Sequence, residues 1–272
     1  MYTAVHSGLL GELPVVDAVK RILDAGIDRA ELNGEELPWT GPHVDPATPA
    51  ATRRALVGLG PYHALAAHHR DFGHPDLQAR SQALTWTRGM LELAADLGIG
   101  FVHVIPGANG DVDGTLAALT ESVEAGQKLG VTVALEAIVN QALATTADVE
   151  LAVSKVPNLR VNFDASHLHV HDHDTVASAR RLGPWVDHVA VKDARGVPED
   201  FAFTAYGAGE IDFDAILVEL CKHGFDGGLS IEHESHWFDG DTRSADEVLA
   251  EAKLVLDGLV SRHQNSGVTA GG

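Results

Sequence analysis

Short apolar segments alternate with longer amphipathic segments along almost the whole chain. The short segments have the length and composition of buried strands, and they predict strands at residues 2–6, 29–33, 62–68, 101–105, 131–136, 159–164, 186–192 and 228–232. Between them apolar residues recur at helical spacing, which predicts helices at residues 13–26, 47–59, 76–98, 113–129, 145–155, 174–182, 212–223 and 243–263. Repeated strand–helix pairs predict an α/β protein, a single-domain (β/α)8 TIM barrel with parallel strands.

The predicted barrel spans residues 1–260 and is followed by a short polar segment. The last helix carries one apolar stripe, formed by Val248, Ala252, Val255 and Leu259. Residues 261–272 lack such a stripe and are rich in glycine and polar residues, so we expect a flexible C-terminal tail there.

Composition and charge narrow the functional classes. The formal net charge of −20 would repel a phosphate backbone, so nucleic acid is not an expected partner. No apolar run approaches the roughly 20 residues that span a bilayer, and the N-terminus shows no signal-peptide pattern. The single cysteine, Cys221, cannot form an intrachain disulfide. We therefore expect a cytoplasmic protein without membrane contact; a homo-oligomer is compatible with the sequence.

The alternation of side chains along the predicted strands indicates which residues point into the barrel. The inward positions include many polar residues: His6, Glu31, His68, His103, Glu136, Asp164, His188, Lys192 and Glu232. Barrel interiors are usually filled with branched apolar side chains. Polarity on this scale predicts a functional site at the carboxyl ends of the strands.

Three carboxylates stand where predicted strands end: Glu136, Asp164 and Glu232. Because the carboxyl ends of parallel strands meet at one rim, these groups are expected to face each other and to repel each other unless a cation lies between them. The sequence therefore predicts a divalent metal ion at the mouth of the barrel. His167 follows Asp164 by three residues, close enough for both side chains to reach one ligand.

Other polar residues near this rim are open to two interpretations. Lys192, at the end of the seventh predicted strand, is expected to pair with a carboxylate or with a substrate oxygen. His188, His68 and His103 are candidates for substrate contact and equally for structural roles. The run His169, His171 and His173 is interpreted as a solvated loop. Trp39 either covers the mouth or packs against its own loop.

Five segments carry a family resemblance: Ala-Leu-Glu (134–136), Asn-Phe-Asp-Ala-Ser-His (162–167), Asp-His-Val-Ala-Val-Lys-Asp-Ala-Arg (187–195), Gly-Ala-Gly-Glu-Ile-Asp-Phe (207–213) and Leu-Ser-Ile-Glu-His-Glu (229–234). On these segments the chain resembles the sugar-phosphate isomerase/epimerase superfamily, the xylose-isomerase-like barrels. The resemblance covers nearly all of residues 1–260. It implies that Glu136, Asp164 and Glu232 hold Mn2+, Mg2+, Co2+ or Zn2+.

The chain departs from the family pattern at the fourth ligand. The family's seventh strand usually reads His-x-His-x-Lys-Asp, with the second histidine on the metal, whereas here Ala190 stands at that position. Ile105 also replaces a histidine that many relatives carry. Three carboxylates and water, with His167 completing the shell, would be rich in oxygen, and oxygen ligands favour Mn2+ or Mg2+ over Zn2+. A weakened or lost metal site is the alternative.

The resemblance implies a divalent-metal-dependent isomerase or epimerase that acts on a sugar or a polyol-derived ketone. Glu136 and Glu232 would move a proton next to the carbonyl through an enediolate intermediate. The expected substrate contacts, besides His167, are Lys192, His188, His68, His103 and Arg195. Two alternatives remain: a metal-dependent dehydratase of an inosose-like or dehydroshikimate-like substrate, and a non-catalytic sugar-binding barrel with a decayed metal site.

Overall fold

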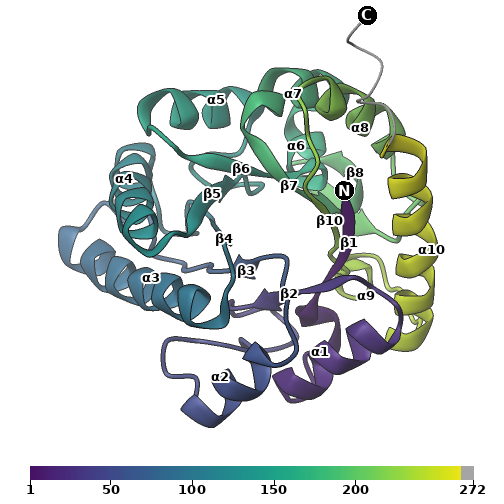
Figure 1. The fold of residues 1–272 in the computed structure, drawn as a ribbon. Coiled ribbons are helices and arrows are strands. Elements are labelled where there is room, and N and C mark those ends of the chain that lie inside the picture. Colours follow the sequence, from purple (N-terminus) through teal and green to yellow (C-terminus); the bar gives the residue numbers. More distant parts are fainter. Residues whose placement is uncertain (265–272) are drawn as a thin grey trace, which may run out of the picture.

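Eight parallel strands close into a barrel, which Figure 1 shows at the centre of the molecule. The structure is a computed structural model and describes residues 1–264. The barrel strands are β1 (Tyr2–His6), β2 (Arg29–Asn33), β3 (Leu65–Ala66), β4 (Phe101–Val104), β5 (Thr132–Glu136), β6 (Arg160–Asp164), β7 (Val186–Val191) and β10 (Gly228–Ile231). Their order around the barrel is β1-β10-β7-β6-β5-β4-β3-β2. The predicted (β/α)8 TIM barrel is therefore confirmed.

An outer ring of helices covers the barrel (Figure 1). Its members are α1 (Val15–Asp24), α2 (Ala50–Val57), α3 (Leu77–Leu97), α4 (Val112–Leu129), α5 (Thr146–Lys155), α7 (Thr175–Leu182), α8 (Phe213–Lys222) and α10 (Ala245–His263). The helix α10 ends three residues beyond the predicted domain end at residue 260, and residues 265–272 of the predicted tail lie outside the described residues. Among residues 1–264, no helix has the length and apolar character needed to cross a membrane.

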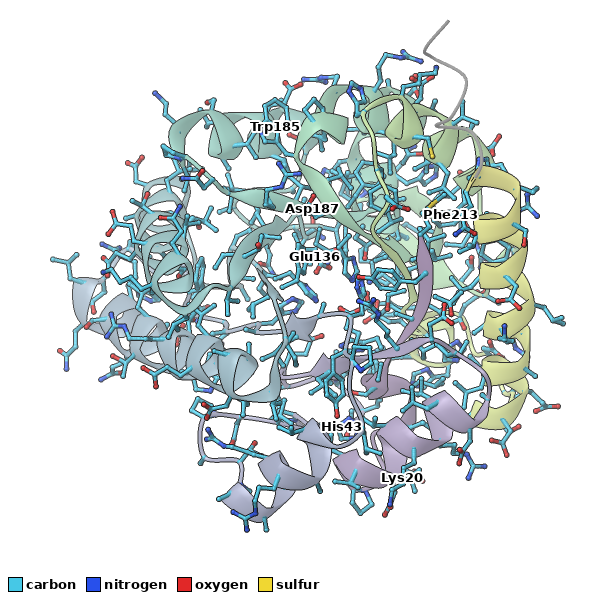
Figure 2. All side chains as sticks on the ribbon, in the orientation of Figure 1. Lys20, His43, Glu136, Trp185, Asp187 and Phe213 are labelled. Atoms are coloured by element: carbon cyan, nitrogen blue, oxygen red, sulfur yellow. The ribbon has the colours of Figure 1, made fainter. Side chains whose placement is uncertain are left out.

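The main core lies between the barrel and the helices. Outward-facing strand residues such as Leu135, Phe163 and Val189 are fully buried there, as the alternation in the sequence predicts. Figure 2 shows Glu136 inside the ring of strands and Lys20 on the outer surface. The polar side chains that remain inside the ring consequently need partners of their own.

The structure corrects the sequence interpretation after β6. The histidine run predicted as a solvated loop forms the helix α6 (Ala165–Asp172), and only His173 lies just beyond it. The Asp164 side chain caps this helix by accepting the backbone N–H groups of Ser166 and His167. The His169 side chain is buried and lies 3.0 Å from Glu210. A carboxylate at the end of a strand can thus begin a helix at once.

A hairpin absent from the sequence prediction follows β7. Its strands β8 (Asp193–Val197) and β9 (Asp200–Thr204) pair antiparallel, and the short helix α9 (Ser235–Phe238) packs near β9. The buried Asp193 carboxylate accepts backbone N–H groups from Gly207, Gly209 and Ile211 at 2.9–3.2 Å. At Gly209 an added Cβ would lie 2.2 Å from Asp193 Oδ1, so this close approach requires glycine. Asp193 therefore joins the start and the end of the segment between β7 and α8.

We predict that Asp193→Ala destabilises the protein by about 2–4 kcal/mol, because several buried N–H groups lose an ionised acceptor. Urea unfolding followed by circular dichroism measures the loss. Asp200→Ala, at an exposed position of the same hairpin, is the matched control and should change stability by less than about 0.5 kcal/mol. Equal stability of the two variants would contradict the prediction.

Candidate functional site

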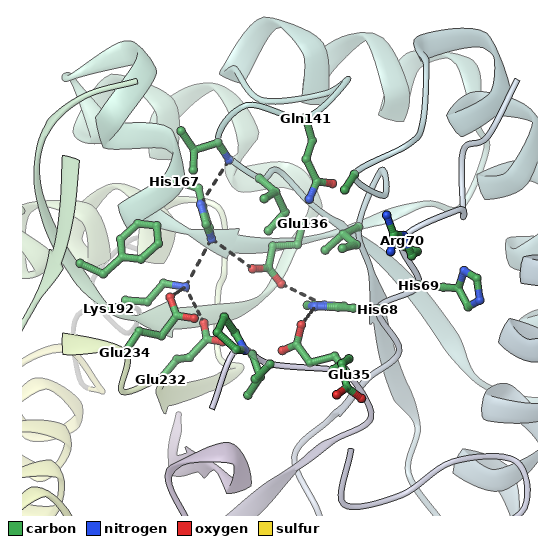
Figure 3. A pocket seen from close by; sticks show the side chains of 18 of the residues that line it. Glu35, His68, His69, Arg70, Glu136, Gln141, His167, Lys192, Glu232 and Glu234 are labelled. Atoms are coloured by element: carbon green, nitrogen blue, oxygen red, sulfur yellow. Dashed lines mark hydrogen bonds and ion pairs between the residues drawn. The ribbon is translucent and has the colours of Figure 1, made fainter. Parts of the chain in front are cut away.

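A cavity of about 600 Å3 opens at the carboxyl ends of the barrel strands, where the sequence predicts the site. Its charged and imidazole side chains point toward one another from several strand ends (Figure 3); they are Glu35, His68, Glu136, His167, Lys192, Glu232 and Glu234. Its apolar wall includes Leu37, Ile105, Phe201, Phe203 and Phe238. The cavity thus has one charged part and one apolar part.

Lys192 lies next to His167, Glu232 and Glu234 in the charged part (Figure 3). Its Nζ contacts three carboxylate oxygens, which we call the carboxylate cluster: Asp164 Oδ2 at 2.9 Å, Glu232 Oε2 at 2.8 Å and Glu234 Oε2 at 3.0 Å. The Phe203 ring covers the ammonium, with its centroid 4.6 Å from Nζ. Burial opposes the charge, but the carboxylate cluster outweighs burial and raises the pKa of Lys192 well above its ordinary value.

The two glutamates of the carboxylate cluster are harder to ionise than usual. Burial raises the pKa of Glu232 and raises the pKa of Glu234 to about 8, although the Lys192 ammonium acts in the opposite direction. At neutral pH the Glu234 side chain therefore carries a proton in most molecules and can act as an acid.

Glu136 has the opposite character. Its Oε2 accepts hydrogen bonds from Asn162 Nδ2 at 2.7 Å and His103 Nδ1 at 2.9 Å, and His68 Nε2 lies 3.5 Å away. Burial alone would raise the pKa of Glu136, but the hydrogen bonds and charges of these two histidines hold the pKa well below its usual value. Glu136 is consequently ionised.

The pairing continues below the cavity, inside the barrel. His103 Nε2 lies 2.6 Å from Glu31 Oε1, and His188 Nε2 lies 3.0 Å from Glu31 Oε2. Burial opposes protonation of His103, but hydrogen bonds to Glu136 and Glu31 outweigh burial and raise its pKa to about 9. His103 therefore carries the positive charge that keeps Glu136 ionised.

The backbone fixes the tautomer of His167. Its Nδ1 lies 3.2 Å from the backbone N–H of Val139, which can only donate, so Nδ1 accepts. Burial and the Lys192 ammonium lower the pKa of His167 to about 4, so the ring is neutral and its proton is on Nε2. His167 thus presents an N–H donor toward the cavity.

Spacing alone would allow a metal ion at part of the predicted site. Ligand atoms of Glu136, Asp164 and His167 lie within 4.8 Å of one another, whereas Glu232 groups with His6 and Glu35 instead. However, Lys192 Nζ lies 2.9 Å from Asp164 Oδ2 and 3.3 Å from His167 Nε2.

The donor atoms around Lys192 also do not suit a cation. The His167 nitrogen that faces the site carries its proton, whereas a histidine ligand normally donates its other nitrogen's proton and offers the facing lone pair. Ala190, between Asp164 and Ser230 in the strand register, has no donor atom. The side chains around Lys192, as arranged, therefore do not fit a divalent cation.

The remaining candidates lie outside the cavity. His103 and His188 are buried in the barrel interior, and Arg195 is at the surface, paired with Asp239 at 2.5 Å. Trp39 donates a 3.4 Å hydrogen bond to the Gly8 carbonyl and packs against His236 and Trp237 of α9. Trp39 therefore joins separate loops near the mouth.

Sequence reasoning missed many residues of the cavity, among them Glu35, Glu234, Phe201 and Phe203. Glu234 follows Glu232 by two residues, a spacing that would have suggested a second carboxylate on the same side. The two phenylalanines reach the cavity only because the hairpin folds over it, and the sequence carries no signal for that placement.

The chain forms a closed parallel barrel with acidic and imidazole side chains at the carboxyl ends of its strands. The sequence pattern of the xylose isomerase-like TIM barrel family matches residues 19–257, so the chain belongs to that family. The resemblance found in the sequence is thereby confirmed.

Individual relatives are distant. The IolI protein, crystallised with a zinc atom, has a TM-score of 0.77 and 20% identity over 97% of this chain and 99% of its own. A D-tagatose 3-epimerase-like protein has a TM-score of 0.77 and 22% identity over 97% and 98%. MJ1311, an uncharacterised protein of Methanocaldococcus jannaschii, is 28% identical over 160 residues, or 56% of this chain and 53% of that protein. The chain thus matches about half the length of this relative, and the two structures show the fold alone.

We predict that the His103 imidazole titrates with a pKa of about 9, and that Glu31→Gln lowers this pKa. Since the folded-state pKa lies above the ordinary 6.5, the charge pair stabilises the fold fully below about pH 6.5 and this stabilisation is lost as the pH rises through about 9. NMR titration of the imidazole signals measures both. Glu150→Gln, on the surface of α5, is the control; a His103 pKa near 6.5 in the wild type would contradict the prediction.

Proposed function

We propose that the protein is an isomerase or epimerase that moves a proton at the carbon next to the carbonyl of a small polyhydroxylated ketone. One observation carries the proposal: a single cavity holds the ionised carboxylate Glu136, the protonated acid Glu234 and the Lys192 ammonium. Environments that push the pKa values of two acids apart assign one as the base and the other as the acid.

Each charged residue of the cavity has its own role in the proposed proton transfer. Glu136 removes the proton through Oε1, since Oε2 is held by His103 and Asn162. The Lys192 ammonium and the His167 Nε2–H stabilise the negative charge that develops on the substrate oxygens. Glu232 or Glu234 returns a proton from the other side of the cavity. The low pKa of Glu136 keeps it ionised but makes it a weak base, so the stabilisation by Lys192 is essential.

The cavity favours an uncharged substrate. Carboxylates outnumber cations around it, which disfavours a phosphorylated sugar. The apolar wall suits the C–H faces of a sugar ring or chain, which pack against aromatic rings while hydroxyl groups face the charged part. We therefore favour a neutral ketose or a keto-polyol.

A dehydratase is the second candidate. It shares the proton abstraction and then loses a neighbouring hydroxyl group, to which the protonated Glu234 can supply the proton. The Mn2+ or Mg2+ predicted from the sequence has no step in this proposal, because the residues around Lys192 do not fit it. The cytoplasmic location and the homo-oligomer remain predictions.

We expect the protein to exchange a substrate C–H for deuterium in D2O, and Glu136→Gln to slow this exchange by about 10²–10⁴-fold. NMR of neutral ketoses and keto-inositols incubated with the protein follows the C–H signals and identifies the product. Glu124→Gln, at the surface of α4, is the control and should exchange like the wild type.

Each other outcome of the D2O experiment has a defined meaning. Exchange accompanied by loss of water identifies the dehydratase. Binding of sugars without any exchange would contradict both enzyme proposals and leave the non-catalytic barrel. Undiminished exchange in Glu136→Gln would remove Glu136 from the mechanism.

A further inference from the structure

We propose that Lys192 takes the place of a divalent cation in this chain, so that the carboxylate cluster holds an ammonium group and the wild-type site is free of metal. The inference rests on the geometry around Lys192 and does not depend on the proposed function. It concerns the one position where the family resemblance implies an ion and the arrangement of this chain's side chains does not fit one.

The contacts of Lys192 are those of a cation in a ligand shell. Its Nζ donates a hydrogen bond to Glu232 at 2.8 Å and lies within 3.0 Å of the other two members of the carboxylate cluster. Its side chain is 2% exposed, and Phe203 covers it on one side. The ammonium thus meets two of the carboxylates expected to surround the ion, Asp164 and Glu232, together with Glu234, which the sequence analysis did not assign.

A metal ion and this ammonium cannot share the position. A divalent cation binds carboxylate oxygens at roughly 2.0–2.6 Å. The Lys192 ammonium nitrogen already lies 2.9 Å from Asp164 Oδ2, so an ion bound to this oxygen would lie close to the ammonium and be repelled by it. Binding would require Lys192 to leave three carboxylates for a less favourable environment. The lysine therefore competes with the ion directly.

Ala190 removes the residue that would favour the metal. It pairs in register with Asp164 of β6 and Ser230 of β10, so a histidine there would place a nitrogen donor beside the cluster. The other nitrogen ligand that the sequence suggested, His167, accepts the Val139 backbone N–H at Nδ1, so the lone pair of this ring points away from the site. With neither imidazole offering a lone pair, the Lys192 ammonium is the cation that these acidic groups contact.

The test is metal binding without substrate, measured on chelator-treated protein by titration calorimetry with Mn2+ and Co2+. The wild type should show no site tighter than about 1 mM, the range of weak protein sites. Lys192→Met should bind one equivalent of Mn2+ at least about tenfold more tightly, because its carboxylate cluster is left without a cation.

Two further variants sharpen the comparison. Ala190→His combined with Lys192→Met should favour Co2+ over Mn2+, since imidazole prefers the former, and should give the visible absorption of a nitrogen-ligated cobalt ion. Lys222→Met is the matched control: this exposed lysine pairs with Glu219 on α8, and its loss should leave metal binding as in the wild type.

A wild-type site for one Mn2+ or Co2+ tighter than about 1 mM that weakens in Glu232→Gln would overturn the proposal. So would a folded Lys192→Met protein, verified by circular dichroism, that binds no more tightly than the wild type. If this variant does not fold, ¹⁵N NMR of the wild-type lysine side chains decides. A buried, slowly exchanging Lys192 ammonium signal that is unchanged by 1 mM Mn2+, about the limit of weak binding, supports the proposal, and its absence or broadening overturns it.

These results are separable from the function. Metal binding by the wild type together with proton exchange would retain the isomerase and reject the lysine substitution. Absence of both metal binding and exchange would retain the substitution and reject the isomerase.

Discussion

The interior of this barrel depends on the pairing of charges that have no access to bulk water. Three centres achieve it: His103 between Glu31 and Glu136, His68 between Glu35 and Glu136, and Lys192 within its carboxylate cluster. Removing one partner from such a pair leaves an uncompensated buried charge, which costs more than the pair itself contributes. Pairing keeps Glu136 ionised, whereas burial raises the pKa of Glu234 to about 8, and both side chains line the same cavity.

Strand boundaries and the inward alternation of side chains were predictable because both follow from local patterns. The carboxyl ends of β1, β2 and β6 match the prediction to the residue, and Glu136 and Asp164 lie where period-two alternation puts them. The predicted third strand, 62–68, is a regular strand only over Leu65–Ala66, although backbone hydrogen bonds to β2 and β4 continue at His63 and Ala67.

The partner of each buried charge was not predictable in the same way. Whether Lys192 contacts a carboxylate or a substrate depends on how the chain runs at the ends of β6, β7 and β10. Nothing in residues 186–192 encodes those paths. The hairpin was missed because its pairing follows directly from β7, and an apolar strand that continues into another strand leaves no turn signal at residue 193. Local patterns thus locate the site, and long-range contacts determine its charge state.

The hydrogen bonds from the backbone N–H groups of Gly207, Gly209 and Ile211 to Asp193 affect how this barrel can change over evolution. One carboxylate closes both ends of the segment between β7 and α8, so the segment is anchored at its base whatever its length. Its tip, between Val197 and Asp200, is exposed and lies away from that anchor. Insertions or exchanges at the tip would remodel the wall that carries Phe201 and Phe203 without disturbing the strands that hold the charges. The fold thereby separates the part of the cavity that can diversify from the part that must stay fixed.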